Sequence, residues 1–479
     1  MADEISTTNS ISTDTASTKP LLLLPANGKQ KYISETTASE DRIKPKLYTR
    51  RWFMLILFCS YSLTNAFQWI HLSIIGNIIH RYYNESLPGD QYQQQLGIEW
   101  LSMVYMLVYI PLIFPATWIL DKKGLRVAGI LGTGINALGA WLKCASISPD
   151  RFGVLMFAQT VCAIAQIFIL GLPPRLAAVW FGPNEVSTAT AIGVFGNQLG
   201  NGVGFLLPPV FVKNDPNLDV VGHGLTIMFY GTAALTTLLF IIVCIVFKKC
   251  PDVPPSQAQA KIVEDAAHEN YIDSLKRLIS NPGFILLMLS YGLNTGSFYG
   301  ISTQLNPLVL KHFPGEEQNA GRIGLTIVLT GIVASILAGI WLDKTKTYKW
   351  TTAGLYIFAF ISMIVFTFTT STHIWVIFVV AGALGFFMTG YLPVGFEFGA
   401  EITYPESEGT SSGLLNASAQ LFGIILTLGM GALLKYGTLA PCLLVAGALL
   451  VGCIMTILIK SDLRRQKAES ERENEMKTI

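Results

Sequence analysis

The chain has 479 residues, of which 51% are hydrophobic and only 13% are charged, and its mean hydropathy is +0.48. Soluble domains carry about a quarter charged residues, so this composition excludes an ordinary soluble protein and indicates an integral membrane protein. The formal net charge of +2 gives no indication of a nucleic-acid partner. Seven scattered cysteines without a CxxC pair indicate neither a disulfide framework nor a zinc site, and no metal or cofactor is expected.

The chain begins with a polar stretch, residues 1–51, which is rich in Ser and Thr and is predicted to be a disordered tail. Its only apolar run, Leu21–Leu24, is too short for the core of a signal peptide. The first hydrophobic segment starts at Trp52 and is expected to act as the insertion signal itself.

Twelve apolar segments follow, each long enough to cross the hydrocarbon core of a membrane as a helix. They lie near 52–79, 98–120, 125–147, 153–178, 187–211, 225–247, 283–305, 321–342, 351–371, 374–399, 410–434 and 438–460.

The longest internal loop separates the first six segments from the last six. We therefore predict two six-helix halves, 52–247 and 283–460, joined by a linker over 248–282 and followed by a C-terminal tail over 461–479. Within the linker, Tyr271–Ile279 can form a short amphipathic helix on the membrane surface, or the linker is a plain tether.

The distribution of basic residues predicts the orientation. Arg50, Arg51 and Lys122 are among a large majority of lysines and arginines that lie on one side of the membrane when the segments alternate. The positive-inside rule places that side, with both termini and the linker, in the cytoplasm. Asn84 in the first outer loop begins an Asn-Glu-Ser sequon, so we expect it to be glycosylated.

The two halves repeat each other. Asp121 ends the second segment and Asp343 the eighth, 222 positions apart, and each is followed by basic residues, Arg126 and Lys344 among them. This predicts the fold of the major facilitator superfamily, in which two pseudo-symmetric halves hold the substrate between them. The basic residues either merely satisfy the positive-inside rule or form latches, Asp121 with Arg126 and Asp343 with Lys344.

Polar and aromatic residues near the middle of segments are the candidate substrate ligands, because an unpaired polar group there is costly. Trp69 and Tyr299 occupy matching positions in segments one and seven, at an offset of 230. Gln166 and Gln420 lie near the middle of segments four and eleven. Asn65, Gln198 and Asn294 are further buried amides that are expected to lie near the cavity.

An aromatic pair with amides suits a small organic cation, since a quaternary ammonium is best held by ring faces, at about 2 kcal/mol for each desolvated contact. No acidic or basic residue lies near the middle of a segment, and Lys143, Glu397 and Glu401 are near segment ends. This favours facilitated diffusion over proton coupling. The alternative is that the two aromatic residues are packing or interfacial residues and that the glutamines join helices.

From Arg50 to Arg465 the chain resembles the feline leukaemia virus subgroup C receptor-related transporters. The resemblance rests on several blocks of sequence in order. These are Asn65–Trp69, Glu99–Met103, Gly124–Arg126, Val179–Gly182, Glu185–Thr188, Phe195–Leu199, Asn319–Gly324, Gly385–Pro393, Glu401–Asn416 and Lys460–Arg465.

This resemblance implies uptake of choline and ethanolamine down their gradients across the plasma membrane. It also implies a choline site made by Trp69 and Tyr299 with the help of Gln166 and Gln420, and all four positions keep the expected residue. Members of the family have also been described as haem exporters, a disputed role.

Two other functions are considered. Haem export requires an axial ligand and a partner for the propionates, and only His71 falls well inside a segment. A membrane sensor that signals through the linker or the tails is the alternative of another class. No nucleophile–base set stands out, so an enzyme is not expected. Besides membrane lipid, no further partner and no oligomeric state is indicated.

Overall fold

The computed structural model describes residues 46–255 and 271–468. Most of the predicted N-terminal tail, the middle of the linker and the end of the C-terminal tail lie outside the described residues. Helix α1 begins at Arg50, two positions before the expected start of the first segment, and part of the predicted C-terminal tail, 464–468, is helical.

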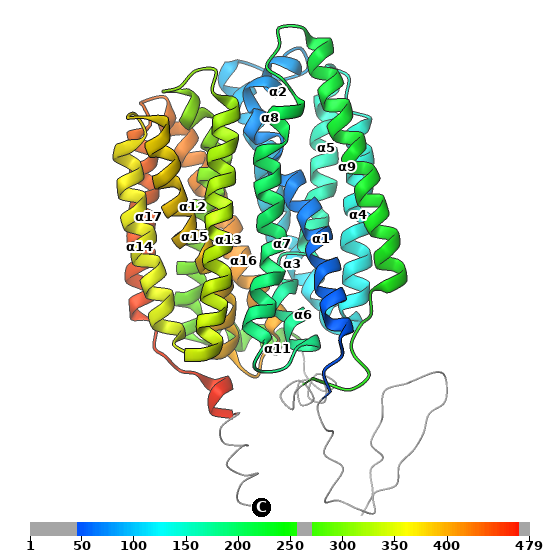
Figure 1. Ribbon diagram of the computed structural model, residues 1–479, viewed down its shortest axis with the longest axis vertical. Coiled ribbons are helices and arrows are strands. Elements are labelled where there is room, and N and C mark those ends of the chain that lie inside the picture. Colours follow the sequence, from blue (N-terminus) through cyan, green and yellow to red (C-terminus); the bar gives the residue numbers. More distant parts are fainter. Residues whose placement is uncertain (1–45, 256–270, 469–479) are drawn as a thin grey trace, which may run out of the picture. The chain divides into compact units, whose positions relative to one another are not determined.

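Two groups of helices lie side by side (Figure 1). The N-terminal half contains α1 (Arg50–Ile70), η1 (Ser73–Ile75), α2 (Gly76–Tyr82), α3 (Gln91–Lys123), α4 (Leu125–Cys144), α5 (Phe152–Ile167), α6 (Leu172–Trp180), α7 (Val186–Leu206), α8 (Pro208–Phe211) and α9 (Leu218–Val246). The C-terminal half contains α11 (Tyr271–Ser280), α12 (Pro282–Leu310), α13 (Glu317–Thr345), α14 (Tyr348–Thr369), α15 (Ile374–Thr403), α16 (Glu408–Leu434) and α17 (Leu439–Leu458).

We call the end of the bundle where α1 begins and α17 ends the tail end, and the opposite end, which carries Asn84, the sequon end. Within the described residues, eleven helical stretches are long and apolar enough to cross a membrane. The one expected segment outside these eleven, the fifth in chain order at 187–211, is also helical, as α7 and α8. It carries Asn197, Gln198 and Asn201, and its polar residues face protein because α7 packs between α1 and α13.

A row of glycines explains how α7 approaches α1 so closely. An added Cβ at Gly196, Gly200 or Gly204 would lie 2.4, 2.2 or 2.5 Å from atoms of α1. These glycines are spaced four residues apart and therefore share one face of the helix. Without side chains on that face, the two backbones pack directly, as in other small-residue contacts between membrane helices.

Two of the crossings are interrupted beside predicted ligands. α1 ends at Ile70, directly after Trp69, and the crossing continues as η1 and α2. α5 ends at Ile167, directly after Gln166, and the chain resumes as α6 with prolines in its first turn. In membrane proteins, irregular backbone is found where it lines a cavity or is buried in protein, which is typical of transporter binding sites.

Candidate functional site

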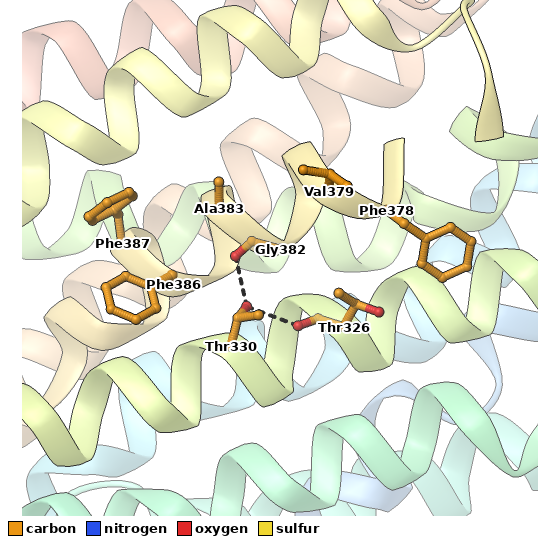
Figure 2. A pocket seen from close by; sticks show the side chains of 8 residues that line it. All are labelled: Thr326, Thr330, Phe378, Val379, Gly382, Ala383, Phe386 and Phe387. Carbon is orange, nitrogen blue, oxygen red and sulfur yellow. Dashed lines mark hydrogen bonds between the residues drawn. The ribbon is translucent and has the colours of Figure 1, made fainter. Parts of the chain in front are cut away.

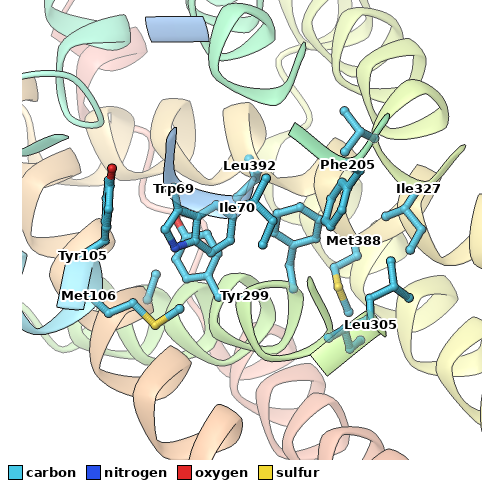
Figure 3. Packing of buried hydrophobic residues seen from close by; sticks show 14 of the residues in the cluster. Trp69, Ile70, Tyr105, Met106, Phe205, Tyr299, Leu305, Ile327, Met388 and Leu392 are labelled. Carbon is cyan, nitrogen blue, oxygen red and sulfur yellow. The ribbon is translucent and has the colours of Figure 1, made fainter. Parts of the chain in front are cut away.

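The rings of Trp69 and Tyr299 meet between the two halves. Trp69 comes from α1 and Tyr299 from α12, and their centroids are 5.1 Å apart with an interplanar angle of 68°. Both side chains are buried, with exposed fractions of 4% and 9%. Figure 3 shows the two rings against each other, with Tyr105 and Met106 of α3 nearby. The structure thus brings together two aromatic residues that are 230 positions apart in the sequence.

Two buried glutamines provide polar atoms without a hydrogen-bond partner in the described part of the chain. These atoms are Oε1 of Gln166 and Nε2 of Gln420, and the two side chains are 6% and 1% exposed. The Gln420 side chain lies beside the hydroxyl of Tyr299, although none of the described hydrogen bonds uses its Nε2. Most buried polar atoms in native proteins have a partner, and exceptions are often explained by function. Free amide atoms in an apolar core are suited to a polar ligand.

A cavity of about 30 Å³ lies between the halves on the tail side of the aromatic pair. Tyr299 lines it together with Gln198 and Asn197 of α7 and Asn416 of α16. This volume holds one or two water molecules at most. The cavity is therefore too small for an organic cation in this arrangement of the halves.

Of the three amides predicted to lie near the cavity, only Gln198 lines it. The Asn65 amide donates to Asn136 Oδ1 at 2.9 Å and to the Cys162 carbonyl at 3.1 Å, all within the N-terminal half. The Asn294 amide donates to the Met388 carbonyl at 2.9 Å within the C-terminal half. Asn65 therefore joins helices within the N-terminal half, and Asn294 joins helices within the C-terminal half.

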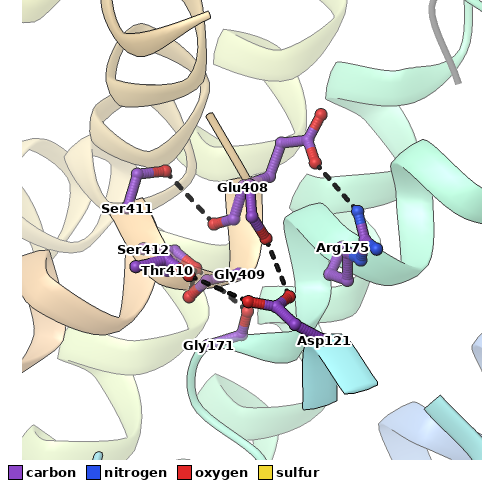
Figure 4. A network of polar contacts seen from close by, with 9 residues as sticks. Asp121, Gly171, Arg175, Glu408, Gly409, Thr410, Ser411 and Ser412 are labelled. Atoms are coloured by element: carbon purple, nitrogen blue, oxygen red, sulfur yellow. Dashed lines mark hydrogen bonds and ion pairs between the residues drawn. The ribbon is translucent and has the colours of Figure 1, made fainter. Parts of the chain in front are cut away.

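At the tail end, Asp121 contacts the opposite half. Its carboxylate accepts hydrogen bonds from the hydroxyls of Ser407 (3.0 Å) and Thr410 (3.2 Å) at the start of α16. Beside it, Arg175 of α6 pairs with Glu408 of α16 at 3.4 Å (Figure 4). The Ser412 hydroxyl also donates to the Gly171 carbonyl at 3.0 Å, so several contacts join the start of α16 to the N-terminal half.

Asp343 makes the symmetry-related contact. Its carboxylate accepts from the Thr188 backbone N–H at 3.1 Å and from the Thr188 hydroxyl at 2.5 Å, at the start of α7. Thr188 and Thr410 are 222 positions apart, the same offset as the two aspartates. Each carboxylate therefore lies at the N-terminus of a helix of the other half, where the helix dipole favours negative charge.

These contacts correct the expected latch pairs. Asp121 was expected to pair with Arg126, but the Arg126 guanidinium donates to the Cys244 carbonyl at 3.2 Å within the N-terminal half. Asp343 was expected to pair with Lys344, which directly follows it in α13; instead it bonds Thr188 across the interface. Neighbouring positions on a helix do not face each other, whereas the packing of the halves brings the helix starts within reach.

Charged residues that the sequence places near segment ends are buried. Lys143 is 2% exposed and donates to Gln68 Oε1 at 3.1 Å. Glu397 is 2% exposed and accepts from the Thr190 hydroxyl at 2.7 Å. Glu99, which the sequence indicated only as part of a motif, is 8% exposed. Sequence position alone gives depth along a segment but not which side of the helix faces protein.

Two further features lie away from the aromatic pair. A groove of about 470 Å³ opens on the surface of the C-terminal half between α13 and α15, lined by Phe378, Phe386 and Phe387 among others (Figure 2). The imidazole of His71 stacks on Phe67 at 5.2 Å, and the side chain is 1% exposed. His71 is thus packed in the N-terminal half, which is the arrangement of a core histidine.

Comparisons with known proteins agree with this architecture. Residues 53–427 match the Major Facilitator Superfamily family. The fucose transporter FucP in its outward conformation superimposes with a TM-score of 0.62 at 14% identity, over 86% of this chain and all of FucP. The chain therefore belongs to the major facilitator superfamily and is a multi-pass membrane transporter, not an enzyme.

Relatives at higher identity define the branch of the superfamily. The choline/ethanolamine transporter flvcr2a of Danio rerio is 54% identical, over 89% of this chain and 90% of its own length. The human choline/ethanolamine transporter FLVCR2 is 49% identical over 91% of this chain and 82% of its own length. The choline/ethanolamine transporter FLVCR1 of Felis catus is 53% identical over 90% of this chain and 77% of its own length. The chain thus belongs to the feline leukaemia virus subgroup C receptor-related family.

Proposed function

We propose that the protein is a uniporter for choline and ethanolamine, which binds the cation between Trp69 and Tyr299 and works by alternating access. The observation that supports this most is the contact of these two rings across the interface of the halves, at 5.1 Å. Relatives at about half identity are named as transporters of these two substrates.

The chemistry of the site suits such a cation. A trimethylammonium group cannot donate hydrogen bonds, so it is stabilised by the negative faces of aromatic rings. The hydroxyl of choline or ethanolamine can bond an amide, and Gln166 and Gln420 have free atoms for it. In the structure the two rings contact each other. We infer that they separate when the halves rock and then enclose the cation.

Alternating access requires contacts at both ends that form and break easily. At the tail end these are the hydrogen bonds of Asp121 and Asp343. At the sequon end Asn77 donates to Glu317 at 3.1 Å and Asn306 donates to the Ile74 carbonyl at 2.8 Å. A hydrogen bond to a charged group contributes about 1.5–3 kcal/mol. Opening either end breaks a few such bonds, and water then replaces the lost partners.

A uniport mechanism fits the position of the buried charges. Glu397 bonds hydroxyls of α7 near the tail end, and Lys143 bonds Gln68 inside the N-terminal half. Neither lines the small cavity beside Tyr299. The cation thus meets no titratable acid at the aromatic pair, and no coupled proton is required there.

We further propose that the protein resides in the cell membrane with its tail end in the cytoplasm. The sequon end then faces outward, and the exposed Asn84 is available for glycosylation. Membrane lipid would cover the groove between α13 and α15. Haem is not the favoured substrate, since the packed ring of His71 lines none of the described cavities between the halves.

The test is choline counterflow with the purified full-length protein in proteoliposomes. We expect labelled choline to enter vesicles that are preloaded with unlabelled choline or ethanolamine, at the same rate with or without gradients of sodium or protons. Tyr299→Ala is expected to abolish the exchange. A requirement for an ion gradient would overturn uniport, and no exchange by the wild type would overturn the substrate.

A further inference from the structure

A second cavity lies between the halves at the sequon end. Its volume is about 230 Å³, which is large enough for a small organic cation, and we call it the outer vestibule. η1, α2 and α3 form one side and α12 the other. Its polar lining residues are Ser73, Asn77, Gln95, Glu99, Thr303, Gln304 and Asn306.

The outer vestibule contains a buried carboxylate. Glu99 is 8% exposed, and both Gln95 and Gln304 interact with its carboxylate. Gly431 of α16 leaves room for this group, since an added Cβ there would lie 3.0 Å from both carboxylate oxygens of Glu99 and from Nε2 of Gln304. No lysine or arginine is among the described residues that line the cavity. The acid is thus held by amides, without a cationic partner in the lining.

Two buried oxygen atoms in the lining also lack a partner among the described residues. They are the hydroxyl oxygen of Ser73 (5% exposed) and Oε1 of Gln304 (1% exposed). With Glu99 they form a set of hydrogen-bond acceptors. Acceptors that surround a desolvated negative charge favour a ligand that is positively charged and can donate hydrogen bonds.

The outer vestibule is separate from the aromatic pair. Glu99 and Met106 are seven residues apart in α3, which is roughly 10 Å along a helix. Met106 lies at the level of Tyr299, since both would contact a Cβ at Gly423. Between the two levels the Ser102 and Thr303 hydroxyls are 3.2 Å apart and join the halves.

We propose that the outer vestibule is a second binding site for small organic ammonium ions, anchored by Glu99, that receives the substrate before it reaches Trp69 and Tyr299. This rests on the proposed transport of such cations. Glu99 supplies a charge–charge contact and the free oxygens accept from the ammonium or hydroxyl group of the ligand. The site holds the cation while the Ser102–Thr303 contact is closed, and passes it inward when the halves part.

The first test is external labelling of Gln95→Cys in the full-length protein. The reagents are membrane-impermeant methanethiosulfonates that carry either a trimethylammonium or a sulfonate group, with the chain lacking the new cysteine as blank. A buried acid in a cleft raises the local concentration of cations, so Glu99→Gln is expected to lower the ratio of cationic to anionic labelling rates about tenfold. Glu316→Gln, an exposed acid outside the cavity, is the matched control and should leave the ratio unchanged.

The second test separates this site from the aromatic pair. Choline at millimolar concentration is expected to slow labelling of Gln95→Cys, also in the Trp69→Ala background, and this protection should disappear with Glu99→Gln. Equal labelling ratios with and without Glu99, or no protection by choline in the Trp69→Ala background, would overturn the proposal. The labelling assay does not depend on transport. If the Trp69→Ala variant still took up choline, the proposed aromatic site would be refuted, but the proposed outer-vestibule site would not.

Uptake kinetics provide a third readout. With Glu99→Gln, we expect the KM for choline to rise about tenfold, equivalent to about 1.4 kcal/mol, while the maximal rate changes less than twofold. A lower maximal rate at unchanged KM would mean that Glu99 supports the structure rather than the ligand, and would overturn the proposal.

Discussion

Replacing the indole of Trp69 by an aliphatic side chain tests the proposed cation site most directly. Trp69 is 4% exposed, so Trp69→Ala leaves a cavity that alone can cost about 3–5 kcal/mol of folding free energy. Trp69→Leu fills more of that volume and still removes the aromatic face. Trp69→Phe keeps a smaller ring at the same place, 5.1 Å from Tyr299 in the wild type.

The size of the effect follows from the contact that is lost. A desolvated cation–ring contact is worth about 2 kcal/mol, and each 1.4 kcal/mol changes affinity by about tenfold. We therefore expect Trp69→Leu to lower kcat/KM for choline roughly 30-fold. Trp69→Phe should lower it by roughly fivefold, because a smaller ring retains about half of the attraction.

The assay is the initial rate of labelled choline uptake over a range of concentrations, normalised to the amount of protein at the cell surface. Trp118→Leu is the matched control, since Trp118 on α3 is 47% exposed and lies away from Tyr299. Uptake by Trp69→Leu within threefold of the wild type would refute the ring-face mechanism. A comparable loss with Trp118→Leu would attribute the effect to folding.

Three further predictions concern the contacts between helices. Asp343→Asn is expected to weaken the bond to Thr188 and to raise several-fold the labelling rate of a cysteine introduced at Ser412, a buried residue of the tail-end interface, since the carboxylate charge at the start of α7 is lost; unchanged labelling would contradict a latch. Gly200→Ala should lower the melting temperature of the purified protein by several degrees, because its Cβ would lie 2.2 Å from the α1 backbone. Gly153→Ala is the control, because no atom lies within 4 Å of the new Cβ, and it should leave the melting temperature unchanged. Arg126→Gln is expected to change choline uptake less than twofold, because its described hydrogen bond stays within one half; a tenfold loss would restore the role that was expected from the sequence.

Asp121 and Asp343, each followed by basic residues, show that a sequence pattern can identify residues without identifying their hydrogen-bond partners. The offset of 222 correctly indicated that Asp121 and Asp343 are equivalent. One of the two interpretations made the nearest basic residues the partners of these aspartates, and the described contacts contradict it. The partners are hydroxyl groups of Thr188 and Thr410 from the other half. The same offset relates these two threonines, and a search of the repeat for paired hydroxyls could have found them.

The linker between the halves also contains a helix that the sequence predicted, with contacts that the sequence did not indicate. The amphipathic pattern over Tyr271–Ile279 predicted a short helix as one of two alternatives, and α11 confirms it over Tyr271–Ser280. The sequence did not indicate its contact. Arg277 of α11 pairs with Glu406 at 2.5 Å, and the Ser274 hydroxyl also donates to Glu406, just before α16. The helix therefore contacts the segment that leads into Ser407 and Thr410, the residues that bond Asp121.

The sequence by itself determined the class of protein and the positions of the membrane crossings. A continuous apolar segment of about 20 residues satisfies its backbone hydrogen bonds in lipid as a helix, because all of these bonds then lie within the segment. The internal repeat then defined the two halves and paired Trp69 with Tyr299.

Only the tertiary structure decided which polar residues face the interface of the halves. Asn65 and Gln198 look alike in the sequence, yet one bonds within its half and the other lines the cavity. Glu99 became a candidate only when η1, α3 and α12 enclosed a space around it. The reason is that hydropathy records the depth of a residue in the membrane, whereas the rotation of each helix is set by its packing against the others.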